Sequence, residues 1–297
     1  MKSVSDRDRP GLVRSGTTVA PANALAGVAA PAPITTAEFA RFQSWLHRVA
    51  GISLADHKKT LLMGRLAKRL AATGMHSYGD YFDLLMNGSR PGELQLAIDL
   101  LTTNETYFFR EPAHFDFLAT EILPYRRDSE PLRLWSAASS SGEEAYTASM
   151  VLADTLGLGQ RWQVFGSDLS ARVLDTARRG HYPMTRAEKI PLDYLKRFCL
   201  KGTGPQEGTF LIDRSLRERV SFAQINLNTN LPDIGMFDVV FLRNVMIYFN
   251  IETKRQVVSR IIAHMRPRAW LFVSHSENLN GVTDQFEAIK PSIYRLR

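Results

Sequence analysis

Cysteine is almost absent from this sequence, which has one such residue, Cys199, among 297. A lone thiol can form neither an internal disulfide nor a cysteine-rich zinc site, so disulfide-stabilised scaffolds and zinc fingers are excluded. A chain without disulfides fits a reducing compartment, and we expect a cytoplasmic location.

Histidines at a metal-binding spacing are lacking too. None of the five histidines named below stands at a spacing from another histidine, a cysteine or a carboxylate that is typical of a metal site, so we expect no bound metal. Structural roles are more common for such residues, and we expect His275 to order its loop. The five are His47, His57, His114, His181 and His275.

Long hydrophobic runs are missing as well. A membrane-spanning helix needs roughly 18 uncharged apolar residues. Even the most apolar stretch, residues 237–249, contains Asp238, Arg243 and Asn244, so we expect no membrane insertion. With 44% hydrophobic and 23% charged residues, the composition is that of an ordinary globular protein. The length suffices for about two domains.

Acidic residues are outnumbered, because 37 Lys and Arg stand against 30 Asp and Glu and give a formal net charge of +7. Such an excess favours an acidic partner. Nucleic acid, an anionic membrane surface and an acidic protein all meet that description, and the charge does not choose among them.

Residues 1–33 are dominated by Ala, Pro, Gly, Ser and Thr. This composition predicts a disordered leader. The alternative is a secretory signal, since Arg7, Arg9 and Arg14 precede an alanine-rich stretch. That stretch is weakly apolar and broken by proline, so we favour the leader, and we assign it no role.

Residues 34–101 show helical periodicity and no strand signal. Phe39, Phe42 and Trp45 recur at helical spacing up to Gly51, and further helices follow from Asp56 onward. We therefore expect a small all-helical domain. Its second helix carries a leucine stripe and a strongly basic face for which we expect no acidic counterpart. The basic residues are Lys58, Lys59, Arg65, Lys68 and Arg69.

Residues 102–297 alternate between strands and helices, which is typical of a doubly wound α/β sheet. They begin with a linker, residues 102–112. A glycine-rich turn at residues 202–208 predicts a small antiparallel hairpin inserted at about residues 190–222. The predicted strands cover residues 132–135, 162–166, 237–242 and 270–274, with residues 292–296 as a candidate edge strand. The predicted helices cover residues 143–156, 171–179, 192–198 and 253–265.

The loop after the first of these strands, residues 136–142, consists of small side chains that let a ligand approach the backbone. Asp168 ends the next strand, where a carboxylate suits a ribose, although such a residue is also a common helix cap. Glu143 and Glu144 follow the loop and would repel a pyrophosphate. They suit a ligand with an ammonium group. Alternatively, they only stabilise the helix that they begin, because negative charges in the first turn interact favourably with the helix dipole.

Polar residues also occur in two segments of the chain where apolar residues would be expected. Asn104, Thr106 and Arg110 lie in the linker, and Arg243 with Asn244 ends the apolar strand. A charged group there must find partners or cost several kcal/mol. Ligand contact is the explanation we favour, and an internal salt bridge is the alternative.

Four segments of the sequence are distinctive when taken together: residues 101–111 (LTTNETYFFRE), 135–144 (WSAASSSGEE), 241–249 (FLRNVMIYF) and 274–278 (SHSEN). They closely resemble the chemotaxis protein methyltransferases of the CheR family, and the likeness extends over about residues 34–297. The resemblance implies a fold for S-adenosylmethionine-dependent methyl transfer, preceded by the helical domain. It implies that the methyl group goes to glutamate side chains of bacterial chemoreceptors, leaving S-adenosylhomocysteine. The leader departs from the family pattern.

The resemblance also implies roles for single residues. In the cofactor site it implies Glu144, or less favourably Glu143, at the ammonium group and Asp168 at the ribose. Arg110 and Tyr248 would orient the substrate carboxylate, which is already an anion at neutral pH and needs neither a general base nor a metal. The remaining cofactor contacts implied are Asn104, Thr106, Arg110, Asn226, Leu227, Arg243 and Asn244.

Two receptor contacts follow from the resemblance. The basic face, Lys58, Lys59, Arg65, Lys68 and Arg69, would dock against receptor helices that carry glutamates. A receptor C-terminal peptide would add a strand at the small hairpin. We expect a monomer. The residues matching the family's peptide site are Lys201, Gly202 and Gly204.

Two other readings remain open. A nucleic-acid methyltransferase would fit the charge, but its usual Pro-Pro-aromatic and Pro-Cys motifs are missing, so we expect no nucleic-acid partner. A non-catalytic module that binds receptors would not need the full set of polar residues Arg110, Asp168, Arg243 and Tyr248.

Overall fold

The computed structural model describes residues 32–125 and 130–297. The leader predicted for residues 1–33 lies outside the described residues, apart from its last two positions. Within the described ranges, no helix is both long and apolar enough to cross a membrane.

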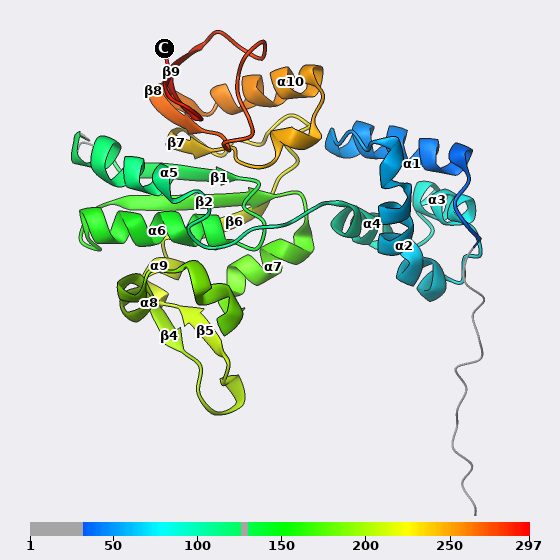
Figure 1. The fold of residues 1–297 in the computed structure, drawn as a ribbon, viewed down its shortest axis with the longest axis horizontal. Coiled ribbons are helices and arrows are strands. Elements are labelled where there is room, and N and C mark those ends of the chain that lie inside the picture. Colours follow the sequence, from blue (N-terminus) through cyan, green and yellow to red (C-terminus); the bar gives the residue numbers. More distant parts are fainter. Residues whose placement is uncertain (1–31, 126–129) are drawn as a thin grey trace, which may run out of the picture. The chain divides into compact units, whose positions relative to one another are not determined.

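Four helices form the predicted all-helical domain (Figure 1). The first begins at a capping box in which Thr35 and Glu38 satisfy each other's backbone N–H groups, and it ends at Gly51 with a left-handed φ of 72°. The buried side chains of Phe42, Trp45 and Leu66 form the centre of the domain. The helices are α1 (Thr36–Ala50), α2 (Lys59–Thr73), which follows a short 3-10 turn, α3 (Tyr78–Asn87) and α4 (Glu93–Leu101).

A seven-stranded sheet follows, with the order β6-β2-β1-β7-β8-β10-β9. The first five strands in that order run parallel, and β10 and β9 are antiparallel additions. The doubly wound α/β fold is therefore confirmed. Its strands are β1 (Leu132–Ala137), β2 (Trp162–Asp168), β6 (Val220–Gln224), β7 (Phe237–Phe241), β8 (Met265–Phe272), β9 (Phe286–Lys290) and β10 (Ile293–Leu296).

Two hydrophobic cores lie on the two faces of this sheet. Along β7, Val239 and Phe241 belong to one core and Val240 to the other, as the two-residue period of a strand requires. The first core contains α5 (Pro112–Phe117) and α6 (Glu143–Leu156), and the second contains α10 (Ile251–Ile262). A sheet covered on both sides explains why β7 is apolar at every position but one.

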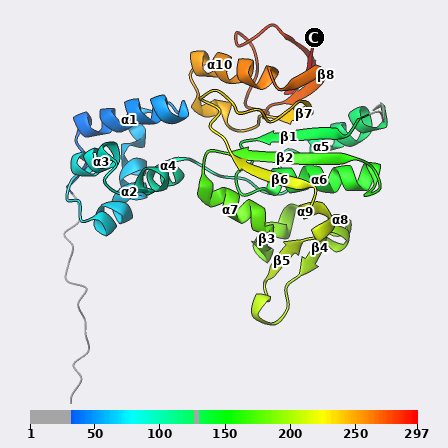
Figure 2. The same ribbon diagram turned by 180° about the vertical axis from the view of Figure 1, so that it is seen from behind.

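The inserted sheet has three strands, in the order β3-β5-β4 (Figure 2). The predicted hairpin is present as β4 (Cys199–Lys201) and β5 (Thr209–Ile212), and α8 (Leu192–Phe198) precedes it. The third strand, β3 (His181–Pro183), pairs with β5 and begins before the range expected for this subdomain. A three-residue strand has too little periodicity to be seen in a sequence.

One strand position differs from expectation. The segment predicted as an edge strand, now β10, lies between β8 and β9, so that β9 forms the edge. The exposed side chains of four of the five β9 residues explain why this strand gave no hydrophobic signal. Between the sheet strands, α7 (Ala171–Arg179) follows β2 with the bounds that the sequence predicted.

Candidate active site

A cavity of about 530 Å³ opens at the carboxyl ends of the parallel strands, lined by the helical domain, the linker and the sheet. Ten residues predicted for catalysis or cofactor contact line it, although they are spread over 145 sequence positions. Parallel strands end at one edge of the sheet, which is why distant loops meet there. These lining residues are Asn104, Thr106, Arg110, Glu144, Asp168, Asn226, Leu227, Arg243, Asn244 and Tyr248.

The linker makes a tight bend at Arg110. Its neighbours Phe109 and Glu111 both have a φ of 55°, which is unusual for residues with a side chain. Such strain of order 1–3 kcal/mol per residue is typical of functional sites. The Arg110 guanidinium donates to the carbonyl of Glu105 at 2.8 Å and lies over the ring of Tyr107. Within the described residues it forms no ion pair with a carboxylate, so its charge is available to a ligand.

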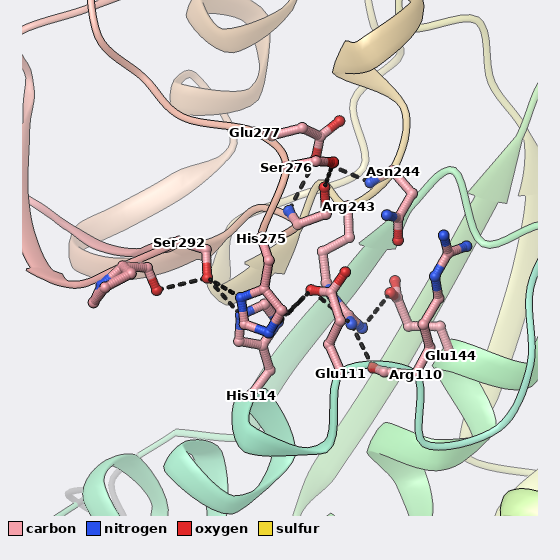
Figure 3. Close-up of polar contacts among 12 residues, drawn as sticks. Arg110, Glu111, His114, Glu144, Arg243, Asn244, His275, Ser276, Glu277 and Ser292 are labelled. Atoms are coloured by element: carbon pink, nitrogen blue, oxygen red, sulfur yellow. Dashed lines mark hydrogen bonds and ion pairs between the residues drawn. The ribbon is translucent and has the colours of Figure 1, made fainter.

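Arg243 has internal partners. Its side chain is 0% exposed and forms ion pairs with Glu144 at 2.8 Å and with Glu111 at 3.3 Å (Figure 3). It also donates a hydrogen bond to the carbonyl of Arg110. The internal salt bridge, which the sequence left as the alternative, is therefore present, and Arg243 is also one of the residues that line the cavity.

The two adjacent glutamates at the start of α6 differ in environment. Glu144 lines the cavity, and its other oxygen accepts a hydrogen bond from Ser136 at 2.7 Å. Glu143 is buried behind the cavity wall and accepts from Ser141. Burial raises the pKa of Glu143. Of the two, Glu144 is the one with access to a ligand.

Asp168 is buried, and each of its oxygens accepts a backbone hydrogen bond of 2.9 Å, from Ser140 and Ser170. It thus stabilises the small-residue loop and the start of α7 while it lines the cavity. Burial raises the pKa of its carboxyl group against these hydrogen bonds. The N-cap of α7 is Ser170, whose hydroxyl accepts from the Val173 amide, so the alternative of Asp168 as the helix cap is wrong.

Asn226 and Tyr248 connect the cavity to the helical domain. The Asn226 side chain donates to the carbonyl of Val49 at 2.7 Å. The Tyr248 carbonyl accepts from the Ser53 amide at 2.8 Å. Leu227, next to Asn226, presents an apolar wall. The helical domain is therefore part of the cavity and not only a neighbour of it.

Glu277 is a structural carboxylate that the sequence reasoning missed. It accepts a backbone hydrogen bond from Asn244 at 3.0 Å (Figure 3), and further ones from Ile247 at 3.1 Å and from Ser274 at 2.9 Å. It holds Asn244 at a φ of 58° and fixes the loop that carries Tyr248. The residue stands in the SHSEN segment, but its partners 30 and 33 positions earlier cannot be read from spacing.

Glu111 was also missed. One of its oxygens lies 3.5 Å from Nδ1 of His114 and 3.9 Å from Nε2 of His275. The ligand atoms of these three residues all lie within 4.8 Å, a cluster that sequence spacing did not predict. Burial, with the charges of Arg243 and His275, lowers the pKa of His114 to about 3.

Three members of the predicted basic face have partners. Arg69 forms an ion pair with the buried carboxylate of Glu93, so the expectation of no acidic counterpart is wrong there. Arg65 donates to the carbonyl of Leu101 and to Thr103, at the start of the linker. Lys59 lies 3.4 Å from the hydroxyl of Thr36. A sequence pattern within one helix cannot show partners from α4.

The remaining predicted contact residues lie at or beside β4. Lys201 is the last residue of that strand, and Gly202 and Gly204 follow it. None of the three lines the cavity described above. β4 pairs with β5 on one side, and its other side carries no strand within the described residues.

The cavity suits S-adenosylmethionine. A carboxylate at its wall, Glu144, matches an ammonium group, and the buried acceptor Asp168 matches ribose hydroxyls. Ile225 and Leu227 supply apolar contact for a purine. The donor set therefore fits this cofactor by charge and by polarity.

Comparison with known proteins shows the family of this chain. Residues 37–102 match the family model for the all-alpha domain of CheR methyltransferases, and residues 104–295 match the model for their S-adenosylmethionine-binding domain. The chain is 40% identical over 265 residues to the chemotaxis protein methyltransferase of Escherichia coli, covering 89% of this chain and 92% of that one. It is 39% identical over 262 residues to chemotaxis protein methyltransferase 2 of Pseudomonas aeruginosa, covering 88% and 93%. The protein belongs to the CheR family of S-adenosylmethionine-dependent methyltransferases.

Proposed function

We propose that this enzyme methylates glutamate side chains of bacterial chemoreceptors in the cytoplasm. The observation that carries the proposal is the cavity itself, where the half-buried cation Arg110 and the hydroxyl-bearing Tyr248 line the same space as the cofactor residues. A carboxylate is the substrate group that a free guanidinium and a phenol recognise best. Relatives named as chemotaxis protein methyltransferases support the receptor as the source of that carboxylate.

The chain's own residues would bind and orient. S-adenosylmethionine, when bound, supplies a methyl group on a positively charged sulfur, which an anionic oxygen accepts without transfer of a proton. Glu144 would hold the ammonium group of the cofactor and Asp168 its ribose, with Asn226 and Leu227 beside its base. Arg110 would draw the substrate carboxylate in, and Tyr248 would donate a hydrogen bond to one of its oxygens. Positioning of this kind accounts for large rate enhancements without acid or base catalysis.

The direct test is transfer of a labelled methyl group to membranes that contain the host's chemoreceptors. Carboxyl methyl esters hydrolyse readily, so base-labile label on a receptor is the expected result. Label that survives base would contradict glutamate methylation. Binding of the cofactor without any label would favour a receptor-binding module that does not catalyse.

The role of Tyr248 is tested by Tyr248→Phe. Loss of one hydrogen bond to a charged group costs about 1.5–3 kcal/mol, so we expect a loss of roughly 10- to 100-fold in kcat with unchanged cofactor affinity. Tyr125→Phe, at a residue 79% exposed, is the control and should leave both quantities unchanged. Full activity of the Tyr248 variant would remove the proposed role.

Receptor docking falls mainly to Lys58 and Lys68, the exposed members of the basic face. Lys58 also lines the cavity, so an acidic helix bound there would present its glutamates to Arg110. We expect Lys58→Glu with Lys68→Glu to raise the KM for receptors and to leave cofactor affinity unchanged. Reversal of the exposed Lys196 and Lys290 changes the net charge equally and serves as the control. If the two double variants changed the KM for receptors equally, the proposed docking surface would be contradicted.

A second receptor contact is proposed at β4. Its open edge and the adjacent Gly202 and Gly204 suit the addition of an extended peptide as a further strand. Such tethering would raise the local concentration of substrate. Calorimetry with C-terminal peptides of the host's receptors should detect binding, and no heat with any of them would count against this contact.

A further inference from the structure

Glu111 occupies an unusual place between the linker and the sheet. Its backbone has a φ of 55° and its side chain is 15% exposed. Its inner oxygen, Oε2, is buried and accepts no hydrogen bond from the described residues. A buried carboxylate oxygen needs a compensating charge, so the identity of its neighbours decides what Glu111 does.

Three side chains face that oxygen: the guanidinium of Arg243 at 3.3 Å, His114 Nδ1 at 3.5 Å and His275 Nε2 at 3.9 Å (Figure 3). They come from the end of β7, from α5 and from the loop after β8. Arg243 is the nearest of the three and is always charged.

The hydroxyl of Ser292 shows why His114 does not supply a counter-charge to Glu111. That hydroxyl donates to the carbonyl of Pro291 at 2.6 Å, so toward His114 it acts as an acceptor, 2.8 Å from Nε2. We therefore assign the proton of a neutral His114 to Nε2, so that Nδ1 faces Glu111 with a lone pair. Two acceptors 3.5 Å apart do not attract each other, so Glu111 depends on Arg243 for its counter-charge.

Arg243 in turn connects Glu111 to Glu144. The guanidinium lies between the two carboxylates, with one terminal nitrogen toward each. Its side chain is fully buried, so it cannot compensate for a lost partner by turning to water. If Glu111 lost its charge, the guanidinium would be left with Glu144 as its remaining carboxylate partner among the described residues. Glu144 would then have less of its charge available to a ligand in the cavity.

We propose that Glu111 is a positioning residue, which holds Arg243 so that Glu144 remains able to bind the ammonium group of the cofactor. The inference rests on the cofactor site of the proposed function, in which Glu144 contacts that group. Glu111 itself would touch neither cofactor nor substrate, because it does not line the cavity.

A double-mutant cycle on binding of S-adenosylhomocysteine, which carries the same ammonium group, tests this coupling. By calorimetry we expect Glu111→Gln to raise the Kd about tenfold in the wild-type background. In a Glu144→Gln background the same change should raise it less than threefold, because the group through which Glu111 acts has lost its charge. Glu111→Asp keeps the carboxylate and should stay within about threefold of wild type.

Asp175→Asn is the matched control, since Asp175 pairs with Arg178 on the surface at 3.0 Å. It should leave the Kd unchanged. An effect of Glu111→Gln below twofold, or an equal effect in both backgrounds, would overturn the proposal, the latter because it would indicate a general structural role. The measurement needs no receptor, so a failure to label receptors would leave its outcome interpretable.

Discussion

Glu93 shows how a single buried charge is stabilised in the helical domain. Its side chain is 5% exposed. One of its oxygens accepts hydrogen bonds from Arg69 at 2.8 Å and from the hydroxyl of Tyr81 at 2.7 Å. The hydrogen bonds from Arg69 lower the pKa of Glu93, although burial opposes them. The carboxylate is therefore favoured in the folded state over the unfolded one.

We expect Glu93→Gln to lower the free energy of unfolding by about 2 kcal/mol at pH 7, because it weakens hydrogen bonds to a charged group. Since the folded-state pKa lies below the unfolded value of about 4.3, this stability is present above that pH and is lost as the pH falls through the folded value. Urea unfolding of both proteins should show their difference shrinking below about pH 4. A difference that is constant down to pH 3 would contradict this account.

Among the elements, the small sheet depends on the turn that follows β4. A Cβ added at Gly202 would lie 2.0 Å from the carbonyl oxygen of Gln206. Gly204, two residues on, has a φ of 56° but open space around it. The two glycines thus serve different purposes: one permits a close approach of two backbone segments, and the other supplies a left-handed conformation.

We therefore expect Gly202→Ala to be the more damaging change. It must displace backbone, whereas Gly204→Ala costs about 1–2 kcal/mol for an unfavourable φ alone. Hydrogen exchange of the β4 and β5 amides should rise more in the first variant, while cofactor binding stays normal in both, because neither glycine lines the cavity. Equal exchange in the two variants would mean that the turn relaxes easily.

In the whole molecule, the helical domain helps to close the cavity. Gly51, at the end of α1, has a φ of 72°, and a Cβ there would lie 2.7 Å from Thr253 and 2.9 Å from Asn228. Gly74 ends α2 with nearly the same φ, 74°, and has no atom within 4 Å of an added Cβ. A side chain at Gly74 would therefore introduce backbone strain alone. A side chain at Gly51 would introduce the same strain and also a steric clash with Thr253 and Asn228.

We expect Gly51→Ala to weaken binding of S-adenosylhomocysteine about three- to tenfold, because it pushes the helical domain away from the loops that carry Asn226 and Asn228. Gly74→Ala carries the same strain of about 1–2 kcal/mol and should leave binding unchanged. Calorimetry of both variants checks this, with thermal unfolding to compare their stability. Equal affinities would show that the cavity tolerates displacement of the helical domain.

The sequence by itself determined the local elements and most of the cavity wall. The bounds of α6, α7 and α8 agree with prediction because helical periodicity and caps act within a few residues. Motif resemblance supplied the residues that line the cavity. It could not supply the order of β9 and β10, the third strand of the small sheet, or the carboxylates Glu111 and Glu277.

Those features depend on which distant segments meet. Arg243 and Glu144 lie 99 positions apart in the sequence, and only the parallel sheet brings them within hydrogen-bond distance. The same folding gave Arg69 an acidic partner from α4, whereas Arg110 forms no ion pair with any carboxylate of residues 32–125 and 130–297. Hydrophobic periodicity is a property of short segments, whereas the partner of a charge is set by packing between segments, and so only the tertiary structure decided it.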